Sequence, residues 1–258
     1  MSAELLTHEA RQRRTAGTVM GLALGAFGFF GIAISGSVGD MFDRLTQDMP
    51  TALQAFVGAD VPGGYVVGEI FTLVVPIAIV AYAVIAGSSA LAGEERDGTM
   101  AILSAQPVTR TRVLWAKAGS LALSLAAVGV LFWGLMALAG WMFDSDLPAA
   151  KMAAGAVHLV FLAAAFAAIA LAVGAATGRP ELASSVTGGL AVAAYLASTM
   201  LPLAGLDRWA ELSPWYYALG SDPLRGGVDL AHLGVFAAIA AAAMAIATIT
   251  FNRRDLRG

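Results

Sequence analysis

The chain holds few residues whose type and spacing could support catalysis. His8 and Glu9 begin the His-Glu-x-x-His pattern of a zinc protease, but Gln12 stands where the second histidine is needed. A Gly-x-Ser-x-Gly turn, which would expose a serine nucleophile, is absent from the sequence. His158 and His232 have no evident serine partner. The sequence therefore predicts no catalytic residue, no bound cofactor and no metal site in this chain.

A pair of acidic residues, Glu94 and Glu95, is the next candidate for chemistry. Such a pair would suit a prenyl-protein protease, yet Thr99 occupies the position where that enzyme needs arginine. An intramembrane enzyme is therefore the least favoured class. The pair instead opens a polar stretch, residues 94–117, that is rich in both signs of charge. In so apolar a chain, we expect this stretch to face water and a protein partner.

Composition identifies the elements that must position these residues. The 258-residue chain is 59% hydrophobic and 13% charged, beyond what a soluble core absorbs. Six uncharged runs of 23 to 27 residues each suit one helical crossing of a bilayer. They lack the alternation of barrel strands. The runs are residues 15–39, 70–93, 118–143, 152–178, 182–206 and 230–252.

The predicted fold is a single all-α transmembrane domain over residues 1–258. Residues 1–14 are expected to form an interfacial helix, and residues 207–229 a structured outer segment. Eleven of the 15 Lys and Arg residues fall on one side of the predicted topology, which predicts two cytoplasmic termini. No cleaved signal peptide is predicted, because the first apolar run is too long and lacks a cleavage site.

Two local features of the runs predict packing and shape. Gly17, Gly21 and Gly25 recur every four residues, which favours close helix packing within or between subunits. Pro76 lies inside the second run and predicts a kink, because its ring removes a backbone donor.

The polar stretch predicts a stiff helical hairpin. Helix two is expected to end near Ala92, and Thr99 to cap a short helix over residues 100–105. Pro107 would end that helix, and Thr109 would cap the next one. Rigid elements of this kind can transmit a push from a docked domain.

The stretch also resembles a known family. Its order and spacing are similar to the Glu-x-x-x-Gly-Thr, Pro-Val-Ser-Arg and trailing Lys pattern of type 2 ABC transporter permeases. The residues that carry the likeness are Glu94, Glu95, Arg96, Asp97, Gly98, Thr99, Leu103, Gln106, Pro107, Val108, Thr109, Arg110 and Lys117. Thr109 stands where serine is usual. The segments 213–217 and 222–226 are similar to a drug and antibiotic exporter branch.

The resemblance implies an ATP-driven exporter in a bacterial cell (plasma) membrane. Two ATP-binding subunits would supply ATP and magnesium chemistry, because this chain lacks a Gly-x-x-x-x-Gly-Lys-Ser/Thr loop. They would push on a coupling region of Glu94 to Thr99, Pro107, Arg110 and Lys117. A second permease, identical or paralogous, would complete the path, and nucleic acid is not an expected partner.

The resemblance also directs attention to helices two and five as the walls of the path. Candidate path residues are Tyr82, Tyr195, Ser198, Thr199 and Met200. Candidate outer-gate residues are Ser213, Pro214, Trp215, Tyr216 and Tyr217. The uncharged helices favour an amphipathic, drug-like or lipid-like substrate. A secondary transporter, or a permease that extrudes sodium, is the alternative.

Overall fold

The structure, a computed structural model, describes residues 15–35, 64–96, 109–220 and 222–254. In these ranges the chain is helical and contains no β-strand. Six helices are long and apolar enough to cross a membrane. Their bounds are Thr15–Ser35, Val67–Arg96, Arg110–Met142, Ala149–Thr177, Pro180–Leu203 and Leu230–Arg253. The predicted all-α architecture is confirmed.

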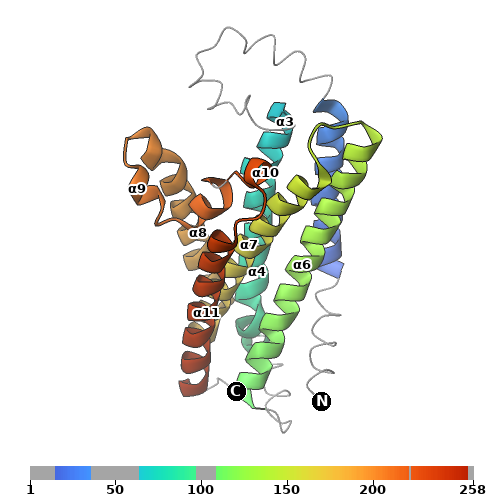
Figure 1. Cartoon of the computed structure of the whole chain (residues 1–258). Helices are drawn as coiled ribbons and strands as arrows, with labels where there is room; N and C mark the ends of the chain where they lie inside the picture. Colours follow the sequence, from blue (N-terminus) through green and yellow to red (C-terminus); the bar gives the residue numbers. More distant parts are fainter. Residues whose placement is uncertain (1–14, 36–63, 97–108, 221, 255–258) are drawn as a thin grey trace.

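Helix α7 (Ala149–Thr177) is the centre of the bundle. It packs against α4 (Val75–Arg96), α6 (Arg110–Met142), α8 (Pro180–Leu203) and α11 (Leu230–Arg253), and in Figure 1 it runs obliquely between α6 and α11. In the 18-residue apolar stretch of α7, 67% of the residues are buried inside the bundle, whereas in the corresponding stretch of α8 only 11% are buried. Helix α8 is therefore the least covered membrane helix in the bundle.

The glycine stripe of the helix Thr15–Ser35 packs against α6 in the same chain. A Cβ added at Gly21 would lie 3.1 Å from the Cα of Val128, and one added at Gly25 would lie 3.0 Å from the Leu131 carbonyl oxygen. Both distances are to backbone atoms that cannot move aside easily. The stripe therefore serves helix packing within the chain.

The second membrane span is interrupted before Pro76. Helix α3 (Gly64–Glu69) leads into the π-helix η1 (Ile70–Val74) and then into α4. The Val75 N–H donates to the Ile70 carbonyl, five residues earlier. This wider turn gives the proline ring room in the helix. The irregularity expected from Pro76 is thus a π-turn on its N-terminal side.

Short elements join the later spans. Helix α7 ends at Gly178, whose φ of 66° is in the left-handed region, and Pro180 begins α8. The segment between α8 and α11 contains α9 (Asp207–Ala210), η2 (Tyr216–Gly220) and α10 (Pro223–Gly226). Asp229 caps α11, and the backbone N–H of His232 lowers the pKa of its carboxyl.

Candidate functional site

The first part of the site is the end of the bundle that carries Arg96, Arg110, Arg179 and Arg253, called here the arginine-rich end (the lower end in Figure 1). Helix α4 continues to Arg96, four residues beyond the end near Ala92 expected from hydropathy. Glu94, Glu95 and Arg96 are therefore helical rather than part of a loop. The charges mark where the helix leaves the apolar core, and they do not end it.

Three ion pairs join this last turn of α4 to other helices. Glu94 Oε1 lies 2.5 Å from Nζ of Lys117 on α6, and Glu95 pairs with Arg254 at the end of α11. Arg96 lies 2.9 Å from Glu181 in the first turn of α8. The Lys117 side chain is only 1% exposed, so its charge is held by the pair instead of by water.

Two further contacts tighten the same end. The guanidinium of Arg110 donates to the carbonyl oxygens of Phe251 and Arg254, at 3.3 and 2.7 Å. Gly178, at the end of α7, faces the Glu95–Arg254 pair, and an added Cβ there would lie 2.7 Å from Glu95 Oε2. The ends of α4, α6, α7, α8 and α11 therefore form one connected charged layer.

Four of the predicted coupling residues, Asp97, Gly98, Thr99 and Pro107, lie outside the described residues, as does the expected short helix 100–105. Thr109 does stand at the N-cap of α6, as predicted, but its side chain makes no capping hydrogen bond. The predicted cap position is thus correct, but the side-chain hydrogen bond expected from Thr109 is not formed.

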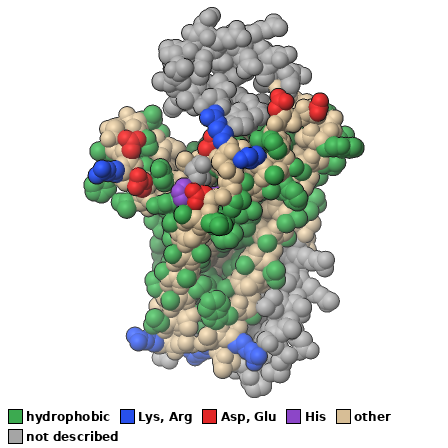
Figure 2. Space-filling model, in the orientation of Figure 1, with side chains coloured by type: hydrophobic (Ala, Val, Ile, Leu, Met, Phe, Trp, Pro, Cys, Tyr) green, Lys and Arg blue, Asp and Glu red, His purple; other side chains and the backbone are tan. Residues whose placement is uncertain are grey.

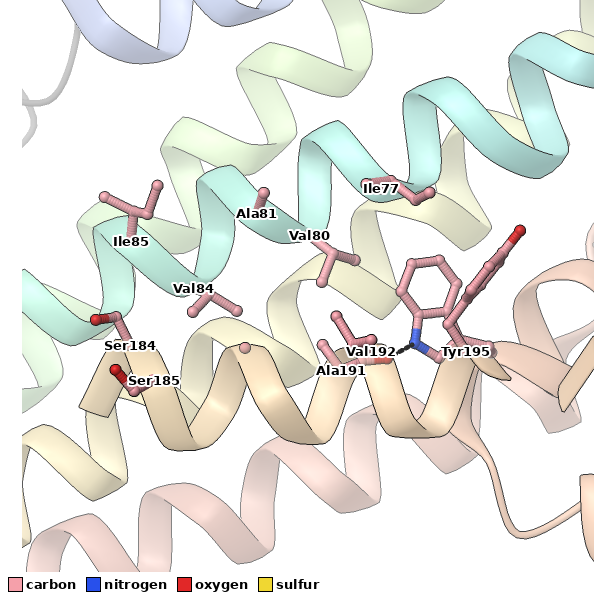
Figure 3. A pocket seen from close by; sticks show the side chains of 12 residues that line it. Ile77, Val80, Ala81, Val84, Ile85, Ser184, Ser185, Ala191, Val192 and Tyr195 are labelled. Atoms are coloured by element: carbon pink, nitrogen blue, oxygen red, sulfur yellow. Dashed lines mark hydrogen bonds between the residues drawn. The ribbon is translucent and has the colours of Figure 1, made fainter. Parts of the chain in front are cut away.

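The second part of the site is an apolar cleft between α4 and α8, with a volume of about 500 Å³. Figure 3 shows α4 on one side and α8 on the other, with Val80 and Val84 directed from α4 toward α8. The wall on α4 includes Val80 and Val84, and the wall on α8 includes Gly188 and Ala191. The exposed side chains of Ile85 and Val192 leave the cleft open at the surface of the bundle.

The two ends of this cleft differ in chemistry. Ser184 and Ser185 lie at the end nearer Arg96, and Tyr195 with Trp215 closes the other end (Figure 3). The two aromatic rings meet edge to face at 5.0 Å. The cleft therefore has serine hydroxyls at one end and the rings of Tyr195 and Trp215 at the other.

The predicted path residues do not all reach the cleft. Tyr195 lines it, whereas the hydroxyl of Tyr82 lies 2.7 Å from Oγ of Ser124 on α6. The hydroxyls of Ser198 and Thr199 donate to the carbonyl of Tyr195 in their own helix. Met200 is exposed on α8 and is not part of the lining.

The predicted outer-gate residues fold back onto α8. Ser213 Oγ donates to the Ala194 carbonyl at 2.7 Å, and Trp215 Nε1 donates to the Ala191 carbonyl at 3.0 Å. Trp215 is buried, so it is a wall of the cleft and not an anchor in a membrane interface.

The rest of the predicted gate lies in the same segment. Pro214 precedes Trp215, and the rings of Tyr216 and Tyr217 meet edge to face at 5.4 Å. Tyr217 also packs against the ring of His232 on α11, at 5.1 Å. The predicted gate residues therefore bridge α8 to α11 on the side away from the arginine-rich end.

No metal site accompanies this arrangement in the described ranges, where no three His, Asp or Glu side chains gather closely enough to hold an ion.

A family model described as "ABC-2 family transporter protein" matches residues 4–256. The chain belongs to the ABC-2 transporter family. A search of curated proteins found no match.

This ABC-2 chain is the permease subunit of an ABC transporter, a multi-pass membrane protein. ABC-2 permeases are transport subunits, not the ATPase, and work with ABC ATP-binding subunits. The family pattern around Glu94 to Lys117 was therefore a sound guide to membership.

Some residues of this ABC-2 permease site were missed from the sequence. The cleft residues Ser184, Ser185 and Gly188 carry no motif. The partners Arg254 and Glu181 carry no motif either. The sequence signal for these ion pairs was weak. Opposite charges at the same predicted end of different helices can pair once the helices pack, but the sequence does not say which residues pair.

Proposed function

We propose that this chain is the membrane-spanning half of an ATP-driven exporter of amphipathic, drug-like or lipid-like molecules. It would lie in a bacterial cell membrane with its arginine-rich end in the cytoplasm. Two ATP-binding subunits would bind ATP and magnesium, and a second permease, a copy or a paralogue, would complete the path. The observation that carries the proposal is that α4 forms both a wall of the apolar cleft and the end that holds Glu94 and Glu95.

Helix α4 supplies the mechanical link in this proposal. From Ile85 in the cleft wall to Glu94 in the charged layer there are nine residues of continuous helix, about 14 Å. Because a helix of this length is stiff, a displacement of its last turn also moves the cleft wall. The ion pairs to Lys117 and Arg254 spread the same displacement to α6 and α11.

The residues proposed to receive the push are those of the coupling region. Glu94, Glu95, Arg96, Arg110 and Lys117 are proposed to act as one ion-paired layer, because each contacts another helix. The remaining members, Asp97, Gly98, Thr99 and Pro107, are proposed to contact the ATP-binding subunit directly.

The cleft lining supports the proposed substrate class. The lining is almost wholly apolar, with serine hydroxyls at one end and Tyr195 at the other. A small inorganic ion would find no charged group there to replace its water. A molecule with an apolar body and one polar end would bury its body and leave that end at the serines.

Filling the cleft tests the proposal. Gly188 lines the cleft and a Cβ added there meets nothing within 4 Å, so Gly188→Leu should fold normally and occupy the space. Gly134→Leu on α6 is a matched control, because it is equally open and is not part of the lining. The complex with its ATP-binding subunits would be placed in vesicles and uptake of a fluorescent amphipathic amine measured.

The expected result is at least a tenfold loss of ATP-dependent uptake for Gly188→Leu and little change for Gly134→Leu. Uptake by Gly188→Leu equal to that of the unchanged protein would remove the cleft from the path. ATP-dependent movement of sodium but of no amphipathic probe would replace the proposed substrate class.

A further inference from the structure

A second apolar hollow lies on another face of the bundle, between α6 and α11. Figure 1 shows these helices close together at the arginine-rich end and diverging away from it, with α7 between them. The groove has a volume of about 270 Å³. Its lining includes Trp115, Gly119 and Ala122 of α6, Ala164 and Ala168 of α7, and Met244 of α11.

The groove exists because most of the side chains that line it are small. Alanine and glycine dominate the facing surfaces of α6 and α7, so the diverging helices leave a space that no side chain fills. The lining runs along α6 from Trp115 to Leu125, about 15 Å of helix. With the volume given above, the mean cross-section is about 18 Å².

These dimensions limit the occupant. A helix is about 10 Å across and is too wide for the groove. An extended hydrocarbon chain is narrow enough, and every side chain in the lining is apolar apart from the indole N–H of Trp115. Since the six spans place this face in a bilayer, an acyl chain of the surrounding lipid is the occupant that fits.

The arginine-rich end of the groove carries the complementary charge. Thr111 and Asn252 join α6 to α11 at this end, with the Asn252 amide donating to the Thr111 hydroxyl at 3.2 Å. The first turn of α6 contains Arg110 and Arg112 and no acidic residue. Figure 2 shows Lys and Arg side chains at this end and hydrophobic side chains above them.

Arg112 is the cation available to a ligand at this mouth. Arg110 is occupied by the carbonyls of α11, whereas the Arg112 side chain is exposed and no described residue pairs with it. It stands one turn from Trp115, whose side chain is 54% exposed beside the groove. An arginine next to an exposed tryptophan is a pairing suited to the polar head group and the first part of an acyl chain.

We propose that this groove binds one anionic phospholipid of the adjacent leaflet, with an acyl chain along α7 and the phosphate on Arg112. A basic site between membrane helices is a recognised arrangement for anionic head groups. The lipid would fill the space that separates α6 from α11 and connect the two helices above their meeting point.

Lipid binding to the purified chain tests this proposal independently of transport. The probes are phosphatidylglycerol and phosphatidylcholine with identical acyl chains, titrated in mild detergent and counted on the intact protein by native mass spectrometry. The first variant is Arg112→Gln, which removes the charge from an exposed position. Its control is Arg179→Gln, an exposed arginine at the same end that stands at the N-cap of α8 and not on α6 beside Trp115.

One arginine at a membrane surface is worth about fivefold in lipid affinity. The unchanged protein should therefore bind the first phosphatidylglycerol about fivefold more tightly than phosphatidylcholine. That preference should disappear in Arg112→Gln and persist in Arg179→Gln. Equal affinity of the unchanged protein for the two lipids, or equal loss in the two arginine variants, would overturn the proposal.

A second variant addresses the acyl chain. Ala122 lies in the lining, so Ala122→Phe should fill the groove and weaken the first binding step of both lipids at least fivefold. Leu123→Phe is the control, since Leu123 is exposed on α6 and outside the lining. Undiminished binding of both lipids to Ala122→Phe would show that the head group alone is held, and would overturn the groove as the site.

Discussion

At the scale of single residues, Lys117 is a charge that the bundle keeps out of water. Its side chain is 1% exposed and depends on the carboxylate of Glu94, 2.5 Å away. Removal of one partner of a buried pair is costly because the remaining charge has no water to replace it. Glu94 is therefore a structural residue as well as a candidate for coupling.

We expect Glu94→Gln to lower the free energy of unfolding by about 3 kcal/mol, since Lys117 would stay buried without its carboxylate. Chemical denaturation in detergent would measure the change. Glu181→Gln is the control, because the Arg96–Glu181 pair is exposed and should contribute little.

The charge-reversed variant Glu94→Lys with Lys117→Glu should recover much of the loss. A Glu94→Gln protein as stable as the unchanged one would contradict this reading.

The sequence alone suggests that Glu94→Ala with Glu95→Ala would uncouple transport and leave the domain folded. The structure changes that expectation, because both glutamates join helices to one another.

Gly178 makes a second prediction at this scale. Its φ of 66° disfavours any side chain, and an added Cβ would also press on the Glu95–Arg254 pair. Gly205 has a φ of 73° with nothing within 4 Å, so it isolates the backbone cost. Gly178→Ala should lower the melting temperature clearly more than Gly205→Ala does. Equal losses would mean that the pair moves aside freely.

At the scale of helices, the hydropathy of the sequence predicted the spans because each apolar run must cross the bilayer. It placed the end of α4 too early, because a charge ends an apolar run without ending a helix, whereas the start of α6 after Thr109 was predicted correctly from the cap. Glu94 to Arg96 and Arg110 to Lys117 remain helical in the structure. Their partners could not be predicted, because Glu95 and Arg254 are far apart in sequence and meet only when α4 and α11 pack.

The cleft shows the same limit. Helices two and five were predicted to line the transport path, which stays a prediction, and the same two helices, α4 and α8, border the cleft. The individual lining residues were harder to predict, because serine and threonine hydroxyls inside membrane helices often donate hydrogen bonds to backbone carbonyls of their own helix. Ser198 and Thr199 do so. Which face of a uniformly apolar helix borders a cavity depends on packing that periodicity does not record.

The glycine stripe gives a prediction for an element. Gly25→Leu should separate the helix Thr15–Ser35 from α6, because an added Cβ would lie 2.5 Å from Leu135 Cδ1 and 3.0 Å from the Leu131 carbonyl oxygen. We expect a loss of about 2 kcal/mol in stability. Gly134→Leu, in open space on α6, should be neutral. The melting temperatures of the two variants in one detergent would decide, and a neutral Gly25→Leu would show that this contact is dispensable.

At the scale of the whole molecule, α8 is left uncovered. Exposed residues recur along one face of it at intervals of three and four: Leu182, Val186, Gly189, Ala193, Leu196 and Met200. This stripe is separate from the cleft lining. A heptad-like stripe with a small residue near its middle is a surface on which another helix can pack. The proposed second permease would cover it and close the open side of the cleft.

The chain contains no cysteine, so a single introduced thiol reports this contact without background. If two copies meet along α8, Leu196→Cys should form a disulfide-linked dimer when membranes are oxidised, because its side chain would face its own copy near the two-fold axis. Leu123→Cys, equally exposed on α6, should remain monomeric on a non-reducing gel. Met200→Cys, one turn further along α8, should cross-link with Leu196→Cys but not with Leu123→Cys. Cross-linking of Leu123→Cys alone would place the partner on α6 and leave the cleft between α4 and α8 open to lipid. A monomer for all three would favour a paralogous second permease over a copy of this chain.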